Sequence, residues 1–143
     1  MARRYTKTFR IRHGHTDPAG IVFYPRHYEL ISATIEDFFR EALGMPFGDL
    51  HVRQRLGVPT VHIETSFLAP SYCDEELEFS LVVIKLGRTS ATFGIDASKD
   101  GGQRLASKHV IANVALDEMR PRPFSASVRE RLAEYLETGE ATA

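Results

Sequence analysis

The sequence predicts an α+β protein in which an antiparallel five-stranded sheet wraps around one long central helix, followed by a short C-terminal helix. Two patterns carry this prediction. Residues 25–43 have apolar side chains spaced three and four apart, and four later stretches alternate apolar with polar side chains. Short turns between consecutive strands are typical of antiparallel pairing, and a single long helix is most simply buried against such a sheet.

The composition is that of an ordinary soluble globular protein. The 143 residues carry a net charge of −1 and are 43% hydrophobic, and we expect one domain over residues 1–143. This charge gives no electrostatic basis for binding nucleic acid. We expect no membrane span, because no apolar run reaches roughly 18 residues, and no secretory signal in residues 1–10. The single cysteine, Cys73, excludes an intrachain disulfide and is compatible with a reducing compartment, so we expect a cytoplasmic protein.

The N-terminal part of the chain predicts one strand and then the long helix. Residues 5–12 alternate apolar and polar side chains, and Pro18 with Gly20 ends this strand. Pro25 suits the first turn of a helix, and Gly44 supplies a stop signal. The apolar stripe of this helix consists of Tyr28, Ile31, Ile35, Phe38, Phe39 and Ala42.

The middle of the chain predicts the other strands. Residues 45–57 form a connector, in which we expect a short helical turn at 50–55. The Lys-Asp-Gly-Gly segment at 99–102 predicts a hairpin turn. The strands are expected at residues 61–69, 77–86, 91–97 and 105–116, the last with apolar positions Ala106, Val110, Ala112, Val114 and Leu116.

The C-terminal part predicts a stop and a second helix. The Arg-Pro-Arg-Pro segment at 120–123 ends the last strand, because proline cannot donate to the ladder. The helix is expected at about residues 125–136, with Ser127 and Glu130 as a capping box. Its apolar stripe consists of Val128, Leu132, Tyr135 and Leu136.

Residues 13–28 concentrate the chemically capable groups of the chain. His13, His15 and Asp17 lie two apart and are a legitimate metal-ligand set, but the other histidines form no second ligand pair. A metal site is therefore the weaker interpretation. Nucleophile and phosphate-loop motifs are absent from the sequence, and the acidic residues after Cys73 disfavour a thiolate.

A carboxylate mechanism is the stronger interpretation of the same segment. Asp17 lies just ahead of a predicted helix whose first turn begins near Phe23 and Tyr24. The free N–H groups of that turn carry partial positive charge and can hold an oxyanion. Asp17 could then attack a carbonyl or activate water. The alternative is that Asp17 only caps the turn before Pro18.

The segment Asp-Pro-Ala-Gly-Ile-Val-Phe-Tyr-Pro at 17–25 resembles the signature of the hotdog-fold acyl-CoA thioesterases of the 4-hydroxybenzoyl-CoA thioesterase type. It is also similar to the Asp-x-x-Gly-x-Val run of relatives linked to the bacterial Tol-Pal envelope system. The resemblance continues through Val-Pro-Thr at 58–60, Ser-Phe at 66–67 and Ser-Tyr at 71–72, and it covers roughly residues 5–120. His13 and His15 depart from the family pattern.

The resemblance implies a hotdog fold and a homo-oligomer, either a dimer with a continuous sheet or a tetramer, whose sites lie between subunits. It implies that Asp17 is the catalytic carboxylate and that the Tyr24 backbone N–H polarises the thioester carbonyl, without a metal or cofactor. The substrate-binding residues that the resemblance implies are Thr60, His62, Glu64, Ser71 and Tyr72. We add Phe23 for its aromatic ring and His15 for its place beside Asp17. The alternatives for His15 are that it orients Asp17 or is a local structural residue. Basic residues that could meet the phosphates of CoA are Lys85, Arg88, Arg120 and Arg122.

The expected activity is hydrolysis of an acyl-CoA thioester to the free acid and CoA. A 4-hydroxybenzoyl-like aryl group is preferred over a short aliphatic chain, because the aromatic residues Phe23, Tyr24, Phe47 and Phe67 could favour it. Hotdog hydratases use a His-x3-Gly-x4-Pro arrangement, which the chain lacks. The alternative is a non-catalytic hotdog protein that binds an acyl thioester or a protein partner.

Overall fold

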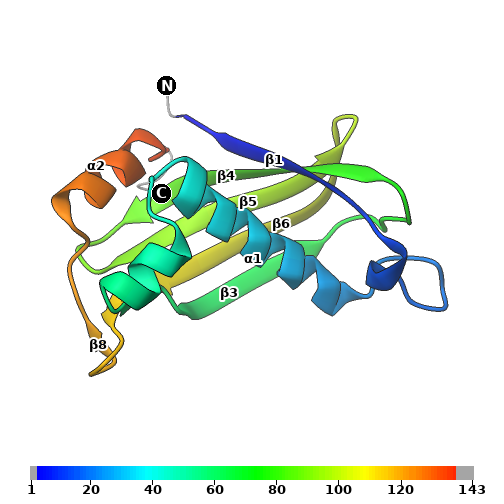
Figure 1. The fold of residues 1–143 in the computed structure, drawn as a ribbon. Helices are drawn as coiled ribbons and strands as arrows, with labels where there is room; N and C mark the ends of the chain where they lie inside the picture. Colours follow the sequence, from blue (N-terminus) through cyan, green and yellow to red (C-terminus); the bar gives the residue numbers. More distant parts are fainter. Residues whose placement is uncertain (1–2, 138–143) are drawn as a thin grey trace.

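Helix α1 (Tyr24–Glu41) lies along one face of a curved five-stranded antiparallel sheet (Figure 1). The computed structural model describes residues 3–137. The strand order is β1-β4-β5-β6-β3, so β1 and β3 are the edges of the sheet. The strands are β1 (Tyr5–Arg10), β3 (Thr60–Phe67), β4 (Glu76–Leu86), β5 (Ser90–Lys99) and β6 (Gly102–Ala112). This is the predicted hotdog arrangement, and that prediction is confirmed.

Smaller elements close the two ends of this layer. Helix α2 (Ala126–Glu134) lies beside the C-terminal end of α1, and the 3-10 turn η1 (His13–His15) lies beside its N-terminal end (Figure 1). The connector expected to hold a helical turn forms the π-helical turn η2 (Asp49–Arg53). A second, three-stranded sheet consists of β2 (Leu56–Gly57), β7 (Val114–Ala115) and β8 (Arg120–Pro121).

Phe38 is the centre of the core between α1 and the sheet. Its side chain is fully buried and contacts four aromatic rings edge-on, at centroid distances between 5.1 and 6.1 Å, which are those of Tyr5, Phe39, Phe93 and Tyr135. Such edge-to-face pairs add about 0.5–1.5 kcal/mol each beyond the burial of their area. Because these rings come from β1, β5, α1 and the end of α2, they fix the helix in register with the sheet.

The hairpin prediction is confirmed in its detail. Asp100 and Gly101 connect β5 to β6, and both have positive φ, 51° and 82°. Two consecutive left-handed residues are the signature of the type I′ turn that joins twisted antiparallel strands.

The prediction for residues 105–116 is wrong in two respects. The strand ends at Ala112, because the buried Asn113 side chain donates to the carbonyls of Arg122 and Pro123, 2.9 and 3.3 Å away. The buried side chains that face the helix are Leu105, Ser107, His109 and Ile111, two of which are polar. The predicted apolar positions Ala106, Val110 and Ala112 therefore belong to the opposite face. Polar residues on the buried face concealed the true alternation.

Two predictions near the C-terminus are also corrected. The Arg-Pro-Arg-Pro segment was expected only to stop a strand, yet Arg120 and Pro121 pair with β7 as an edge strand. The cap of α2 is Ser125, whose hydroxyl accepts from the Val128 N–H at 3.3 Å, and the predicted capping box of Ser127 and Glu130 does not start the helix.

Candidate functional site

Asp17 lies in a tight turn that is closed by its own hydrogen bonds. Its N–H donates to the Ile21 carbonyl at 3.0 Å, and its carbonyl accepts from the Gly20 N–H at 2.8 Å. Its carboxylate oxygen Oδ1 accepts from the Ala19 N–H at 2.9 Å. Gly20 permits the turn because its φ is +85°, which strains other residues. The turn therefore uses one carboxylate oxygen and orients the side chain.

The same turn is joined to the N-terminal end of α1. Thr16 pairs with Val22 across the turn, and the Phe23 N–H donates to the His15 carbonyl at 2.9 Å. Phe23 is the N-cap residue and has extended backbone, so α1 begins at Tyr24. Within residues 3–137, no acceptor is assigned to the Tyr24 N–H. A free N–H at the positive end of an 18-residue helix can stabilise a developing oxyanion.

An open groove of about 440 Å³ lies beside this helix end. This volume is within the range of about 300–1,000 Å³ that is usual for small-molecule sites. Phe67 forms one wall, with its ring centroid 6.1 Å from Tyr24 and 5.5 Å from His27. The lining is largely apolar and consists of Ile21, Val22, Tyr24, His27, Phe67, Leu68, Ala69, Pro70 and Ser71.

A second hollow, of about 490 Å³, lies on the face of the sheet that points away from α1. Its lining includes Val82, Gly94 and Ala106 together with charged residues such as Arg4 and Asp96. Although it is slightly larger, no residue of the Asp17 turn or of α1 lines it. The groove at the helix end is therefore the better candidate for an active site.

Ser71 and Tyr72 lie close to the Asp17 turn, but they are not equivalent. Ser71 is buried, and its carbonyl accepts from the Val22 N–H at 2.9 Å. Tyr72 is 48% exposed and pairs with Ile21.

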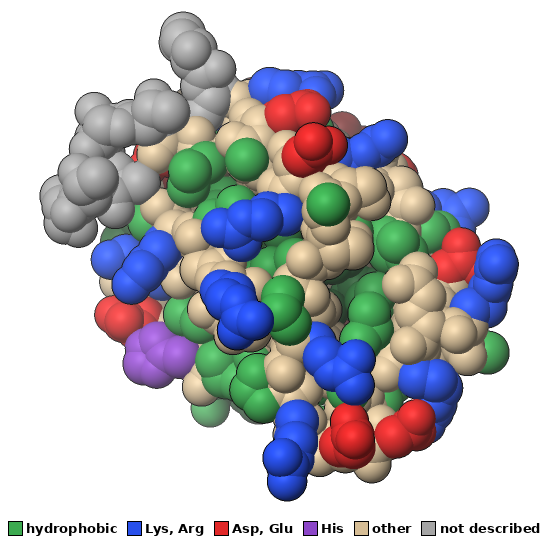
Figure 2. Space-filling view, turned by 90° about the vertical axis from the view of Figure 1, so that its left-hand side faces the viewer, with side chains coloured by type: hydrophobic (Ala, Val, Ile, Leu, Met, Phe, Trp, Pro, Cys, Tyr) green, Lys and Arg blue, Asp and Glu red, His purple; other side chains and the backbone are tan. Residues whose placement is uncertain are grey.

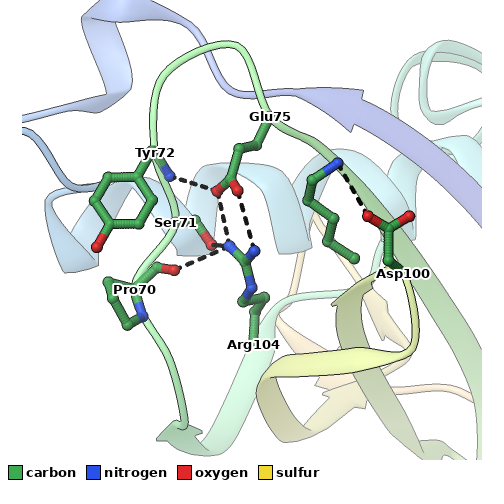
Figure 3. Close-up of polar contacts among 7 residues, drawn as sticks. Pro70, Ser71, Tyr72, Glu75, Asp100 and Arg104 are labelled. Carbon is green, nitrogen blue, oxygen red and sulfur yellow. Dashed lines mark hydrogen bonds and ion pairs between the residues drawn. The ribbon is translucent and has the colours of Figure 1, made fainter.

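The segment that contains Ser71 and Tyr72 is held by Arg104, which forms a two-pronged ion pair with Glu75 at 2.8 and 3.1 Å (Figure 3). Hydrogen bonds from Arg104 hold the pKa of the Glu75 carboxyl down at about 2.

His15 and His27 are neighbours with different surroundings. His15 Nδ1 accepts from the Arg12 N–H at 2.9 Å, which gives this ring a role in closing η1. The His27 side chain is buried, and its Nδ1 has no partner within the described residues. Burial, followed by the nearby charge of His15, lowers the pKa of His27. Burial therefore favours the neutral form of the imidazole that His27 presents to the groove.

The predicted residues of β3 do not reach the groove of their own subunit. Phe67 lies at the groove, and Thr60 at the opposite end of the strand is roughly 20 Å away at about 3.3 Å per residue. Thr60 Oγ1 lies 2.6 Å from Nε2 of the buried His109. His62 and Glu64 are exposed and hydrogen-bond each other at 3.0 Å. These three residues follow the unpaired edge of the sheet.

The predicted CoA-contacting residues lie at the far end of the molecule. β8, which holds Arg120, is at the opposite end of α1 from η1 (Figure 1), and α1 is about 27 Å long at about 1.5 Å per residue. The Arg88 carbonyl accepts from the Phe124 N–H at 3.3 Å, which places Arg88 at the same end. Figure 2 shows basic side chains spread over this end. The structure therefore separates Lys85, Arg88, Arg120 and Arg122 from Asp17 within one subunit.

The metal interpretation of His13, His15 and Asp17 finds no geometric support. Among residues 3–137, no three His, Cys, Asp or Glu side chains are grouped so that they could hold a metal ion. The 3-10 turn at His13–His15 replaces the extended strand that would have placed the three side chains on one face.

None of the helices among the described residues has the length and apolar character needed to cross a membrane.

Three residues near the groove were missed from the sequence. His27 falls on the predicted helix but carries no motif of its own. Arg104 lies on β6 and Glu75 in the turn just before β4, 29 residues away in the sequence, so no local spacing links them. A signal existed only for Glu75, which follows the Ser-Tyr segment in an acidic turn.

Comparison with known proteins agrees with this geometry. The sequence model of the thioesterase superfamily matches residues 19–106. A 1,4-dihydroxy-2-naphthoyl-CoA hydrolase from Acaryochloris marina is 27% identical over 115 residues, which cover 79% of this chain and 81% of the relative. A 4-hydroxybenzoyl-CoA thioesterase from Pseudomonas sp. is 32% identical over 92 residues, which cover 63% of this chain and 64% of the relative.

A solved structure gives the same result. A gentisyl-coenzyme A thioesterase superposes with a TM-score of 0.80 at 26% identity, covering 87% of this chain and 99% of that one. The family match includes α1, β3 and the groove and begins just after Asp17. The predicted family and the predicted class of enzyme, a thioester hydrolase, are both confirmed. The chain belongs to the thioesterase superfamily.

Proposed function

We propose that the protein hydrolyses an aryl-CoA thioester, of the 4-hydroxybenzoyl-CoA kind, to the free acid and CoA. The observation that carries this proposal is the hydrogen-bonded turn that joins the Asp17 carboxylate to the free N–H of Tyr24 beside the groove. The three relatives are named for CoA thioesters of hydroxylated aromatic acids. The aromatic groove residues Tyr24 and Phe67 are suited to a flat acyl group.

The two groups have complementary roles in the proposed reaction. The Tyr24 N–H and the positive end of α1 stabilise the negative charge that develops on the thioester oxygen. In one route Asp17 attacks the carbonyl carbon and expels the thiolate of CoA, and water then hydrolyses the acyl–Asp17 anhydride at the Asp17 carboxyl carbon. In the other route Asp17 removes a proton from a water molecule that attacks the thioester directly and expels the thiolate. These routes differ in the origin of the new carboxylate oxygen. A single turnover in ¹⁸O-labelled water leaves that oxygen unlabelled for nucleophilic attack and labelled for general-base catalysis.

The substrate-binding residues complete this proposal. His15, Phe23, Ser71 and Tyr72 lie around the Asp17 turn and the helix end. We propose that the remaining predicted residues contact a substrate held in a partner subunit's groove. These residues are Thr60, His62 and Glu64 and the CoA-contacting set Lys85, Arg88, Arg120 and Arg122. The arrangement within one subunit supports this assignment, because these residues lie far from its own Asp17.

A homo-oligomer is part of the proposal, and β3 is the surface that we assign to it. This edge strand has no neighbour on its outer side within the described residues. Val61 and Phe67 on β3 are 60% and 44% exposed, which is unusual for large apolar side chains next to an unpaired edge. Antiparallel pairing of two β3 edges would continue the sheet between subunits. We keep the cytoplasm as the expected compartment, because Cys73 is a free thiol.

Asp17→Asn tests the proposal, with release of free thiol from a panel of acyl-CoA thioesters as the measurement. The variant keeps the oxygen that closes the turn but loses the charge, so we expect kcat to fall by about 10²–10⁴-fold. Asp37→Asn is the matched control, because Asp37 lies on α1 away from the groove. Full activity of Asp17→Asn would disprove the mechanism. Absence of hydrolysis by the parent, with acyl-CoA still bound, would favour the non-catalytic alternative.

A further inference from the structure

Arg104 connects β6 to the segment that forms one wall of the groove. Its backbone carbonyl accepts from the N–H groups of Leu68 and Ala69, at 2.8 and 3.3 Å. Its guanidinium donates to the Pro70 carbonyl and to Ser71 Oγ, at 2.9 and 3.0 Å (Figure 3). One residue therefore holds four consecutive residues of this wall, all of which line the groove.

The Glu75 carboxylate completes the arrangement from the other end of the segment. It accepts hydrogen bonds from both terminal nitrogens of Arg104, and its Oε1 also accepts one from the Tyr72 N–H at 2.8 Å. The side chains of Arg104 and Glu75 are only 15% and 21% exposed. A two-pronged, half-buried pair is geometrically more specific than an exposed one, because two parallel hydrogen bonds fix its orientation.

The held segment is bonded in turn to the backbone just before α1. The Ser71 carbonyl accepts from the Val22 N–H at 2.9 Å, and Tyr72 pairs with Ile21. Val22 precedes the N-cap residue Phe23, and the free Tyr24 N–H follows directly. The position of this N–H relative to the groove wall therefore depends on where Ser71 is held.

We propose that Arg104 is a positioning residue for the reaction proposed above, holding residues 68–75 so that the groove wall and the Tyr24 N–H keep a fixed separation. Arg104 does not touch the reacting atoms. It acts through Ser71 and Val22 on the donor that stabilises the oxyanion. A misplacement of about 1 Å between such groups can cost roughly a hundredfold in rate.

Arg104→Lys is the primary test because lysine keeps the charge but cannot form the planar two-pronged contact. We expect kcat toward an aryl-CoA substrate to fall at least tenfold, with KM changed by less than about threefold. Arg55→Lys is the matched control. Arg55 also directs two nitrogens at one carboxylate, that of Asp117 at 2.9 and 3.3 Å, but it is not among the groove residues. Its kcat should equal that of the parent.

Glu75→Gln tests the other half of the pair without changing shape. If the two residues act as one unit, the double variant Arg104→Lys/Glu75→Gln should have nearly the same kcat as the worse single variant. Multiplication of the two losses would contradict a shared role. Parent-like kcat in both single variants would overturn the proposal.

Amide hydrogen exchange gives a readout that does not depend on activity. In Arg104→Lys, the N–H groups of Val22 and Tyr72 should exchange faster, because both depend on the side-chain contacts. The Leu68 N–H should keep its protection, because it is bonded to the Arg104 backbone carbonyl, which the substitution retains. General loosening would accelerate all three and would contradict the proposal.

The two proposals can fail separately. If the parent hydrolyses no thioester but the exchange pattern changes as expected, the proposed function fails and the mechanical role of Arg104 stands. If the parent is active and Arg104→Lys changes neither kcat nor exchange, the positioning role fails and the proposed function stands.

Discussion

The ring of Phe67, at the end of β3, lies 5.5 Å from the ring of His27 in the first turns of α1. This contact brings an edge strand to the helix terminus that carries the proposed oxyanion donor. Phe67 is 44% exposed, whereas His27 is buried beneath it. The pair therefore forms a wall with an aromatic face and a polar atom behind it.

Phe67→Ala should reduce activity toward aryl substrates more than toward short aliphatic ones. The substitution removes an aromatic wall, and one aromatic contact contributes about 0.5–1.5 kcal/mol, which corresponds to a roughly two- to twelvefold change. The measurement is kcat/KM for an aryl-CoA and for a short-chain acyl-CoA. An unchanged ratio between the two would show that Phe67 does not contact the acyl group. Phe47→Ala is the control, because Phe47 packs against Phe39 outside the groove.

Gly20→Ala should destabilise the protein by about 1 kcal/mol, because an L side chain at φ +85° is strained. Gly14→Ala is a matched control in the same segment. At both positions an added Cβ would meet no atom within 4 Å, but only Gly20 has a positive φ. Chemical denaturation of the two variants measures the difference. Equal stabilities would mean that the turn can relax to another conformation.

Acidification should lower stability through the buried histidines. Burial lowers the pKa of His27 and of His109 below the ordinary value of 6.5. Between pH 6.5 and the lower pKa values of the folded state, these histidines therefore bind more protons in the unfolded chain than in the folded chain. The free energy of unfolding should be at its full value above this window and fall as the pH falls through it.

The measurement is urea denaturation between pH 8 and pH 5. His27→Gln and His109→Gln should each flatten the curve below pH 6.5, and the double variant should flatten it further. A slope that both single variants leave unchanged would assign the acid sensitivity to other groups.

Phe38→Ala should cost about 3–5 kcal/mol of stability, because it empties a fully buried site among four aromatic rings. Phe23→Ala is the control for the loss of a phenyl ring, since Phe23 is 48% exposed. Denaturation midpoints compare the two. A loss for Phe38→Ala as small as that for Phe23→Ala would mean that the core collapses around the cavity.

The sequence predicts the fold well where the periodicity is clean. The stripe through Ile31, Ile35 and Phe38 and the alternation through Leu77, Phe79 and Leu81 both face the core as expected. The prediction is wrong for β6, because the polar residues Ser107 and His109 interrupt its buried face. Ala106 and Val110 on the other face are apolar, so the sequence makes that face look like the buried one. Asn113 ends this strand through carbonyls that lie nine and ten residues later, which local propensity does not encode.

The candidate site also contains parts that the sequence predicts and parts that it does not. The Asp17 turn and the helix start are local in sequence, so their motif predicts them. The Arg104–Glu75 pair joins β6 to the turn before β4, and only the folded chain brings these two segments together. The orphan nitrogen of His27 depends on burial, and the distance of Arg120 from Asp17 depends on the length of α1, neither of which a motif contains.

The open edge of β3 has a kinetic consequence. If a site is complete only when two β3 edges meet, the rate per subunit is a property of the assembled pair and depends on total protein concentration. Dilution below the dissociation constant of that pair should make specific activity fall with time, and concentrating the sample should restore it. The activity per subunit would then rise with the concentration of the protein itself.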